Sequence, residues 1–403
     1  MIALESATTI GAHAQRYPPN SSLACPSLDG GEALGRSTTL SVSLSQQTVS
    51  GVSGPLAGRP KFAGRRLGRY WLVERLGRGC QGDVWKAIQV EPFIESVALK
   101  ILPRALARDP RRRAQFRREA ERGARLCGPC LLPTYEYGEI EGIVFIAMPL
   151  VNGCSLHDVV TYRRDPGNDV LPTRLHAIAF ESDSAYARGV ARVFSRVARA
   201  LDEVHGQRVA HRDIKPANIL LDRGPDDGVF LCDFGLARDL DFATPEQMRD
   251  GSGTPLYMPP ERLLREPSDE IKCDIYALGA TLFEALALVP PFQVPENLPW
   301  SDWAAFLALA DPPRPSHLRG GIPADLEAIV IRAMDRDPRR RHATAAAVAD
   351  ELDQYLARPV PVPVVRADTP HKPIAVRAGH PAAAGPARGA RANAPGVGPA
   401  GGR

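Results

Sequence analysis

Three polar side chains lie close together in the sequence VAHRDIKPANILLD, which covers residues 209–222. Asp213, Lys215 and Asn218 supply an acid, a base and an amide, and the apolar run that follows them is typical of a strand. Asp233 lies twenty residues after Asp213, in LCDFGLAR, at the end of another apolar run. A mainly positional and electrostatic reaction such as phosphoryl transfer needs a set of this kind.

The oxygen atoms of this set suit a hard cation such as Mg²⁺, which takes one or two protein carboxylates when a nucleotide is also bound. Asn218 and Asp233 are the candidate metal ligands. Asp213 is then free to accept a proton from an attacking hydroxyl, and Lys215 can offset charge on the transferred phosphoryl group. We therefore expect a phosphoryl-transfer site in this part of the chain.

A glycine-rich sequence, LGRGCQGDVWKA, lies upstream. Gly77, Gly79 and Gly82 form the pattern G-x-G-x-x-G, and glycine lets a backbone approach phosphate closely. The same pattern opens dinucleotide-binding folds, where it leads from a strand into a helix. Here DVWKAIQV follows and predicts a second strand, which favours a hairpin lying over phosphates. An ordinary glycine-rich hairpin is the alternative that this motif alone leaves open.

The sequence VALK ends an apolar strand with a cation, Lys100. Its partner is expected to be a ligand phosphate or the carboxylate of Glu119 on the next helix, whereas a surface position is the usual place of a lysine. That helix should begin at Asp109-Pro110, because a capping residue followed by proline is a good helix start.

The elements that must position these residues change in type along the chain. Residues 70–150 contain β-type runs with one helix among them, and residues 185–356 show mostly helical periodicity. A β-rich part followed by an α-rich part predicts an α+β fold with two lobes and a cleft between them.

These motifs together resemble those of the protein kinases. GRGCQGDV, VALK, HRDIKPAN, DFG and PPE occur in the family's order within residues 67–356. The resemblance implies a bilobed fold, with a small antiparallel β-sheet N-lobe and helix C at about 67–150 and a larger, mainly helical C-lobe at about 151–356. It also implies transfer of the γ-phosphate of Mg-ATP to protein hydroxyls, with autophosphorylation. The DIKPAN sequence is of the serine/threonine type.

The resemblance further implies a role for each matched residue. Lys100 would hold the α- and β-phosphates and pair with Glu119, Asp213 would be the catalytic base, and Asn218 and Asp233 would bind Mg²⁺. The nucleotide would be contacted by Leu76, Gly77, Gly79, Gly82, Val84, Ala98, Lys100, Met148, Pro149, Val151 and Leu220.

The resemblance implies supporting contacts as well. Thr254 would help to form the serine/threonine substrate site, Glu261 would pair with Arg341, and Asp274 would brace the catalytic loop from a buried helix. An ATP-binding scaffold of the pseudokinase type is the alternative, although none of the five main catalytic positions carries a degenerate residue.

Two features of the chain depart from the family pattern or concern its activation. Gly123 stands one turn after Glu119, where the family packs a bulky apolar residue. The helix that carries Glu119, which corresponds to helix C of the family, could therefore loosen and leave the pair of Lys100 and Glu119 unformed. Arg212 precedes the catalytic Asp, and we expect Asp250 to substitute in part for an activating phosphate beside it. Possible phosphorylation sites are Thr244 and Ser252.

The ends of the chain differ in composition from its middle. Residues 1–66 are rich in Ser, Gly, Thr and Ala with little periodicity, which predicts a disordered leader. Residues 357–403, rich in Pro, Ala, Gly and Arg, predict a disordered basic tail. The catalytic domain would occupy residues 67–356 between them.

Composition limits the function classes. Fifty basic and 46 acidic side chains give a net charge of +4, too balanced to indicate nucleic acid as a partner. The basic run RRRAQFRR is expected to be a solvated face or to contact a phosphorylated loop, with nucleic acid as the alternative. Neither a membrane span nor a signal peptide is predicted, so we expect a cytoplasmic protein. ATP and protein substrates would be its partners.

Seven cysteines scattered along the chain predict reduced thiols. The sequence CGPC, from Cys127 to Cys130, has the C-x-x-C spacing of redox sites. However, it follows a predicted helix instead of opening one, so an ordinary turn is favoured over a redox role.

Overall fold

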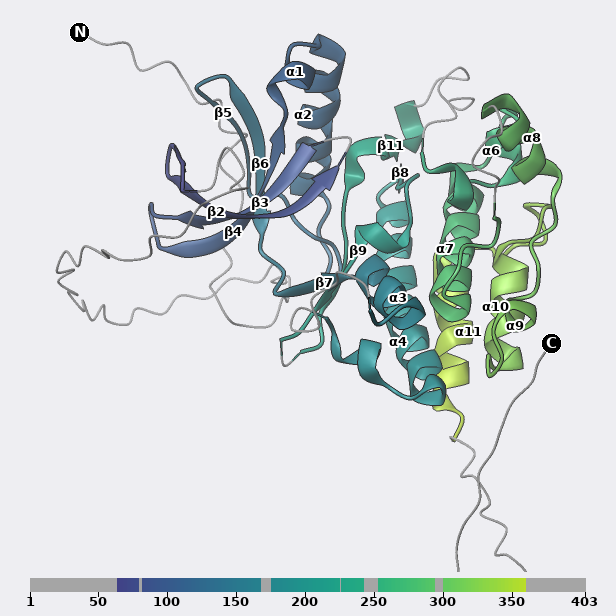
Figure 1. Ribbon diagram of the computed structural model, residues 1–403. Coiled ribbons are helices and arrows are strands. Elements are labelled where there is room, and N and C mark those ends of the chain that lie inside the picture. The colour runs from purple at the N-terminus through teal and green to yellow at the C-terminus, as the bar shows by residue number, and fades with distance from the viewer. Residues whose placement is uncertain are drawn as a thin grey trace, which may run out of the picture. The chain divides into compact units, whose positions relative to one another are not determined.

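The computed structural model of the chain describes residues 64–79, 82–167, 175–224, 226–242, 253–293 and 300–359 (Figure 1). The predicted leader and tail lie almost wholly outside these residues and stay predictions. At their inner ends, Arg66 already belongs to the first strand and Ala357 ends the last helix. The predicted α+β fold with two lobes is confirmed: a β-sheet lobe comes first and a helical lobe follows.

The N-lobe is built on one antiparallel sheet with the strand order β1-β2-β3-β4-β6-β5. Alternate side chains of these strands enter a core that includes Tyr70, Trp85, Leu99 and Phe145. Successive side chains of a strand point to opposite faces of a sheet, so these core residues share one face. The strands are β1 (Arg66–Leu67), β2 (Tyr70–Gly79), β3 (Gly82–Gln89), β4 (Glu95–Leu102), β5 (Glu136–Ile140) and β6 (Ile143–Pro149).

Two helices follow β4, namely α1 (Arg104–Ala107) and α2 (Pro110–Arg125). The predicted start of α2 is confirmed, since the Asp109 side chain accepts a hydrogen bond from the backbone N–H of Arg111 and proline fills the first helical position. Phe116 and Ala120 on the buried face of α2 pack with Leu102, Val144 and Ile146 of the sheet. α2 therefore rests on the sheet and presents Glu119 to β4.

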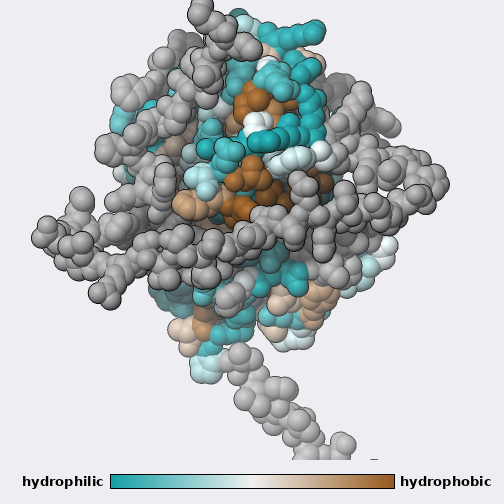
Figure 2. All heavy atoms as spheres, turned by 90° about the vertical axis from the view of Figure 1, so that its left-hand side faces the viewer, coloured by the Kyte–Doolittle hydropathy of each residue, from teal (hydrophilic) through white to brown (hydrophobic). Residues whose placement is uncertain are grey.

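Figure 2 shows the side of the molecule that carries the N-lobe sheet, where hydrophobic residues gather between hydrophilic ones. Exposed large hydrophobic residues on β2 and on the β3–β4 connection are Trp71, Val73, Leu76, Phe93 and Ile94.

The C-lobe combines short strands with longer helices. Strands β7 (Gly153–Ser155), β9 (Ile219–Asp222) and β10 (Val229–Leu231) form one antiparallel sheet, and β8 (Val209–Ala210) pairs with β11 (Arg238–Asp239). The helices are α3 (Leu156–Arg164), α4 (Asp183–Gly206), α6 (Pro260–Leu263), α7 (Glu270–Ala287), α8 (Trp300–Leu309), α9 (Pro315–Leu318), α10 (Ala324–Ala333) and α11 (Ala345–Ala357). Single 3-10 turns are η2 (Ala177–Phe180), η3 (Pro216–Asn218), η4 (Phe234–Leu236), η5 (Leu240–Phe242) and η6 (Pro255–Tyr257).

Helix α7 lies at the centre of this lobe, with α4 and α10 packed against it and α11 packed against α4 (Figure 1). All residues of α7 except Ile271 and Lys272 are buried. A helix that is apolar on all sides must be surrounded by other elements. Its buried carboxylates, Glu270 and Asp274, can therefore form hydrogen bonds and ion pairs only with the segments packed around the helix.

In the described part of the chain, no helix is long and apolar enough to cross a membrane.

Candidate active site

The loop between β8 and η3 carries Asp213, and a buried carboxylate of α7 holds this loop in place. Asp274 accepts hydrogen bonds from the backbone N–H groups of His211 and Arg212, each at 2.7 Å. His205 of α4 contacts the same carboxylate at 2.9 Å. Burial alone would raise the pKa of Asp274, but the His205 contact and the other donors outweigh it and lower the pKa. The predicted bracing role of Asp274 agrees with this geometry.

Asp213 lies at the centre of a small polar cluster. Its Oδ2 is 2.7 Å from the ammonium of Lys215, and its Oδ1 accepts a hydrogen bond of 2.8 Å from the Thr254 hydroxyl. Lys215 also donates to Thr254 at 3.0 Å. Asn218 donates through Nδ2 to the Asp213 backbone oxygen at 2.7 Å and to its carboxylate at 3.2 Å. The structure thus brings the predicted trio and Thr254 together.

Asp233 follows β10 and stands in the left-handed backbone region, with φ of 67°. Its Oδ1 accepts hydrogen bonds from the Lys100 ammonium at 3.2 Å and from the Gly235 N–H at 3.3 Å. Burial alone would raise the pKa of Asp233, but the nearby charge of Lys100 outweighs it and lowers the pKa. The Asp233 side chain is therefore ionised at neutral pH.

Lys100 of β4 donates to Glu119 of α2 at 2.7 Å, and both side chains are buried. Burial acts to lower the pKa of Lys100, but the charges of Asp233 and Glu119 outweigh it and raise the pKa. Burial, reinforced by the charge of Asp233, raises the pKa of Glu119 to about 7 against the attraction of Lys100. One ammonium therefore links a helix of the N-lobe to the loop after β10.

The expectation that Gly123 would leave this pair unformed is wrong for this structure. A Cβ atom at Gly123 would stand 2.3 Å from the hydroxyl oxygen of Thr134. The backbone N–H of Thr134 donates to the Gly123 carbonyl at 3.0 Å. The glycine lets the segment before β5 approach α2 closely, and this contact holds the helix where a bulky residue would not fit.

The predicted nucleotide residues of the N-lobe lie on adjacent strands. Val84 of β3 is the cross-strand neighbour of Lys100, and Ala98 of β4 is the neighbour of Met148 on β6. Gly82 has φ of 151°, and a Cβ there would stand 2.6 Å from the backbone oxygen of Ile101, so only glycine fits.

The other predicted nucleotide residues occupy both lobes. Gly77 and Gly79 lie at the end of β2 with Leu76, which is 39% exposed. Pro149 ends β6, Val151 follows it on the way to β7, and Leu220 lies on β9 of the C-lobe.

Sequence reasoning missed a second carboxylate of α7. Glu270 is 3.1 Å from the Arg212 guanidinium and 3.6 Å from that of Arg238, and all three are buried or nearly so. Its signal is its position four residues before Asp274, on the same face of the helix, where it follows the N-cap residue Asp269. Asp250, which we expected beside Arg212, lies outside the described residues with Thr244 and Ser252.

The predicted pair of Glu261 and Arg341 is present as a two-pronged ion pair, with N–O distances of 2.7 and 3.0 Å. Cys127 and Cys130 are free thiols that follow the C-terminal end of α2. Their position after a helix, and not at a helix N-terminus, leaves Cys127 without the feature that stabilises a redox thiolate.

The family model described as "Protein kinase domain" matches residues 70–352, which is more than half of the chain. The chain therefore belongs to the protein kinase family.

Three known proteins show how far the similarity extends. Serine/threonine-protein kinase PknH of Mycobacterium tuberculosis (strain ATCC 25618 / H37Rv) is 36% identical over 304 residues, covering 73% of this chain and 43% of PknH. Serine/threonine-protein kinase PknE of the same strain is 35% identical over 296 residues, covering 73% and 47%. The crystal structure of a double mutant of the M. tuberculosis PknI kinase domain matches with a TM-score of 0.53 and 28% identity, covering 73% of this chain and 98% of that domain. The chain spans less than half the length of the two curated relatives.

Proposed function

We propose that this chain is a protein serine/threonine kinase, which transfers the γ-phosphate of ATP to serine and threonine hydroxyls of proteins, its own included. The observation that carries the proposal is the position of Lys100, which pairs at once with Glu119 of α2 and Asp233 after β10. Elements of both lobes meet at this ammonium, as a phosphate-holding lysine requires. The similarity to PknH and PknE supports the serine/threonine class.

Asp213 acts in this proposal as the base that accepts the proton of the acceptor hydroxyl. Its carboxylate is oriented by Lys215 on one oxygen and Thr254 on the other. Lys215 lies beside the reacting position and offsets negative charge on the phosphoryl group. Thr254, which also contacts Lys215, helps to define the place of the entering serine or threonine.

Asn218 and Asp233 are proposed to hold Mg²⁺ together with the nucleotide phosphates. The donor set fits this hard cation, since Asp233 is ionised and Asn218 uses its amide nitrogen for Asp213, which leaves its amide oxygen as the ligand atom. When bound, the ion neutralises charge on the β- and γ-phosphates.

The nucleotide is proposed to lie beneath the turn between β2 and β3, against Ala98 and Met148. Pro149 offers a carbonyl but no N–H, so the backbone from Pro149 to Val151 would hold the adenine amino group through a carbonyl oxygen. The catalytic unit is proposed to be residues 67–356, which agrees with the extent of the family match.

The test is incorporation of labelled γ-phosphate from ATP into the full chain and into a generic basic protein. Label is expected with Mg²⁺, is expected to disappear with a chelator, and should fall at least a hundredfold in Asp233→Asn. Asp311→Asn, at an exposed position after α8, is the matched control and should retain full activity. ATP binding without any label in the wild-type chain would contradict the proposal and indicate a scaffold.

A further inference from the structure

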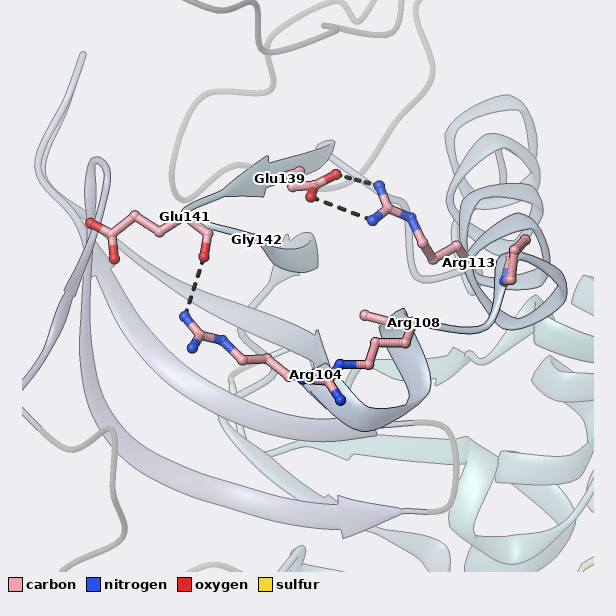
Figure 3. A pocket seen from close by; sticks show the side chains of 8 residues that line it. Arg104, Arg108, Arg113, Glu139, Glu141 and Gly142 are labelled. Carbon is pink, nitrogen blue, oxygen red and sulfur yellow. Dashed lines mark hydrogen bonds and ion pairs between the residues drawn. The ribbon is translucent and has the colours of Figure 1, made fainter.

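A pocket of about 740 Å³ lies in the N-lobe, bounded by α1, the start of α2 and the turn between β5 and β6. Figure 3 shows Arg104, Arg108 and Arg113 on the helical side of the pocket and Glu139, Glu141 and Gly142 on the side of the turn. None of these residues belongs to the candidate active site. The pocket is therefore a separate feature of the surface.

The charges around the pocket do not cancel. Arg113 pairs with Glu139 through two hydrogen bonds (Figure 3). Arg65 pairs with Glu141 at 2.9 Å, so both carboxylates are neutralised. Arg104 donates at 3.2 Å to the backbone oxygen of Glu141, which carries no charge. Within the described part of the chain, the Arg108 guanidinium has no hydrogen bond or ion pair. Two positive charges are left for an anion.

The basic character extends beyond the pocket wall. Arg111 and Arg112, in the first turn of α2, are exposed and have no side-chain partner among the described residues. Planar guanidinium groups bind phosphate through paired N–H donors. The pocket thus has the chemistry of a site for a phosphate group that several arginines can reach.

The N-terminal segment of the chain enters the described structure beside this pocket. Arg65, the second described residue, makes the ion pair with Glu141 on the pocket rim. The twelve residue-to-residue steps from Ser53 to Arg65 could span about 40 Å when extended. Any hydroxyl near Ser53 is therefore within reach of Arg104 and Arg108.

Residues 37–53, just upstream, complement the charge of the pocket only when their hydroxyls are phosphorylated. Between Ser37 and Ser53 the chain contains nine serine and threonine residues and no charged residue. Unmodified, it offers no charge to the arginines. Each phosphate would add about −1.5 to −2 charges and three acceptor oxygens.

We propose that the pocket formed by Arg104 and Arg108 binds a phosphorylated serine or threonine of the chain's own segment 37–53. The proposal rests on the proposed function, because kinase activity would supply the phosphate. Docking this segment would tie the leader to α1 and α2, and α2 carries Glu119. Phosphorylation of the leader would in this way become coupled to the helix that holds the Lys100 pair.

The test measures binding of synthetic peptides 37–53 by fluorescence anisotropy to the full chain after phosphatase treatment. One peptide carries phosphate on Ser50 and Ser53, and its partner carries none. The phosphopeptide is expected to bind at least tenfold more tightly, with an affinity that falls as salt rises and as pH drops below about 6, where the phosphate loses charge.

Two variants distinguish binding in the pocket from nonspecific attraction to the positive charge of the protein. Arg104→Glu with Arg108→Glu should weaken phosphopeptide binding at least tenfold, whereas Arg125→Glu, at the opposite end of α2, should leave it unchanged. Both arginines of the pocket are exposed, and an unchanged melting temperature would show that the double variant folds. Equal binding of both peptides, or unaffected binding by the double variant, would overturn the proposal.

A single-stranded oligonucleotide serves as the competing ligand. If it binds more tightly than the phosphopeptide and depends on the same two arginines, the pocket is a nucleic-acid site and the proposal is wrong. Because the phosphate is supplied by synthesis, the outcome does not depend on kinase activity. A chain that binds the phosphopeptide but transfers no label contradicts the proposed function alone, and an active chain that ignores the peptide contradicts the pocket alone.

Discussion

At the scale of single residues, the site depends on how charges share partners. Lys100 sits between Glu119 and Asp233, and these two carboxylates respond differently to the same ammonium. The pKa of Asp233 falls below its ordinary value, whereas burial raises the pKa of Glu119 to about 7. The sequence shows that the three residues are present, but the opposite directions of the two pKa shifts follow from burial and from the distances between the charged groups.

The raised pKa of Glu119 predicts a pH-dependent difference in stability. The folded chain holds this proton more tightly than the unfolded chain, whose Glu pKa is about 4.3. The stabilisation that Glu119 adds to the free energy of unfolding is therefore complete below about pH 4.3 and is lost as pH rises towards 7. Glu119→Gln has no such loss, so its melting temperature should rise relative to wild type between pH 5 and 7.5 in the absence of nucleotide.

Glu139→Gln is the matched control for this measurement, because Glu139 is exposed and lies in the same lobe. Its difference from wild type should vary much less with pH. A Glu119→Gln difference that is constant across the range would show that the carboxylate titrates at its ordinary pKa.

Burial also decides how the cysteines near the site behave. Cys232 precedes Asp233, and burial raises its pKa to about 12. The thiolate needed for alkylation is therefore scarce at neutral pH. Cys80, in the glycine-rich turn, lies outside the described residues.

At the scale of elements, glycine and helix ends set the position of α2. The capping of α2 at Asp109 was predictable because it is a local interaction between neighbouring residues. The role of Gly123 was not predictable, because its partner Thr134 comes from another segment. The same position that departs from the family pattern thus allows a close contact between α2 and the chain before β5.

Gly123→Ala is expected to destabilise the chain, although alanine normally favours a helix interior by about 1 kcal/mol over glycine. The new Cβ would overlap the Thr134 hydroxyl, and overpacking of this kind costs about 1–3 kcal/mol. Denaturant unfolding measures the loss, and kinase activity should fall with it because α2 carries Glu119.

Two further variants test the cause. Gly206→Ala, at the end of α4 where a Cβ meets no atom within 4 Å, should not destabilise the chain. Thr134→Ala combined with Gly123→Ala should recover part of the lost stability. If Gly123→Ala is as stable as wild type, the helix has room that this structure does not contain.

At the scale of the whole molecule, buried charges tie distant parts of the C-lobe together. Glu261 of α6 and Arg341 are 80 positions apart in the sequence and form an ion pair whose side chains are almost fully buried. Arg341 also donates to the backbone oxygens of Asp335 and Lys272. This arginine therefore joins α6, α7 and the segment before α11.

Glu261→Ala should lower the free energy of unfolding by about 3–5 kcal/mol, since it leaves a buried guanidinium without its carboxylate. Asp337→Ala removes the partner of the exposed Arg339 and should change stability little. Denaturant unfolding of both variants makes the comparison. Equal effects would mean that the Glu261 pair is as accessible to water as the surface pair.

The sequence by itself determined the family, the α+β class, the start of α2 and the set of candidate catalytic residues. These depend on short motifs, on local capping and on hydrophobic periodicity, all of which are written in neighbouring residues. Tertiary structure decided which partners those residues take: Lys100 with two carboxylates, Gly123 against Thr134, Glu270 against Arg212, and the pocket beside Arg65. The physical reason is that burial and long-range contacts set charge, space and distance, and they exist only after segments far apart in the chain have packed together.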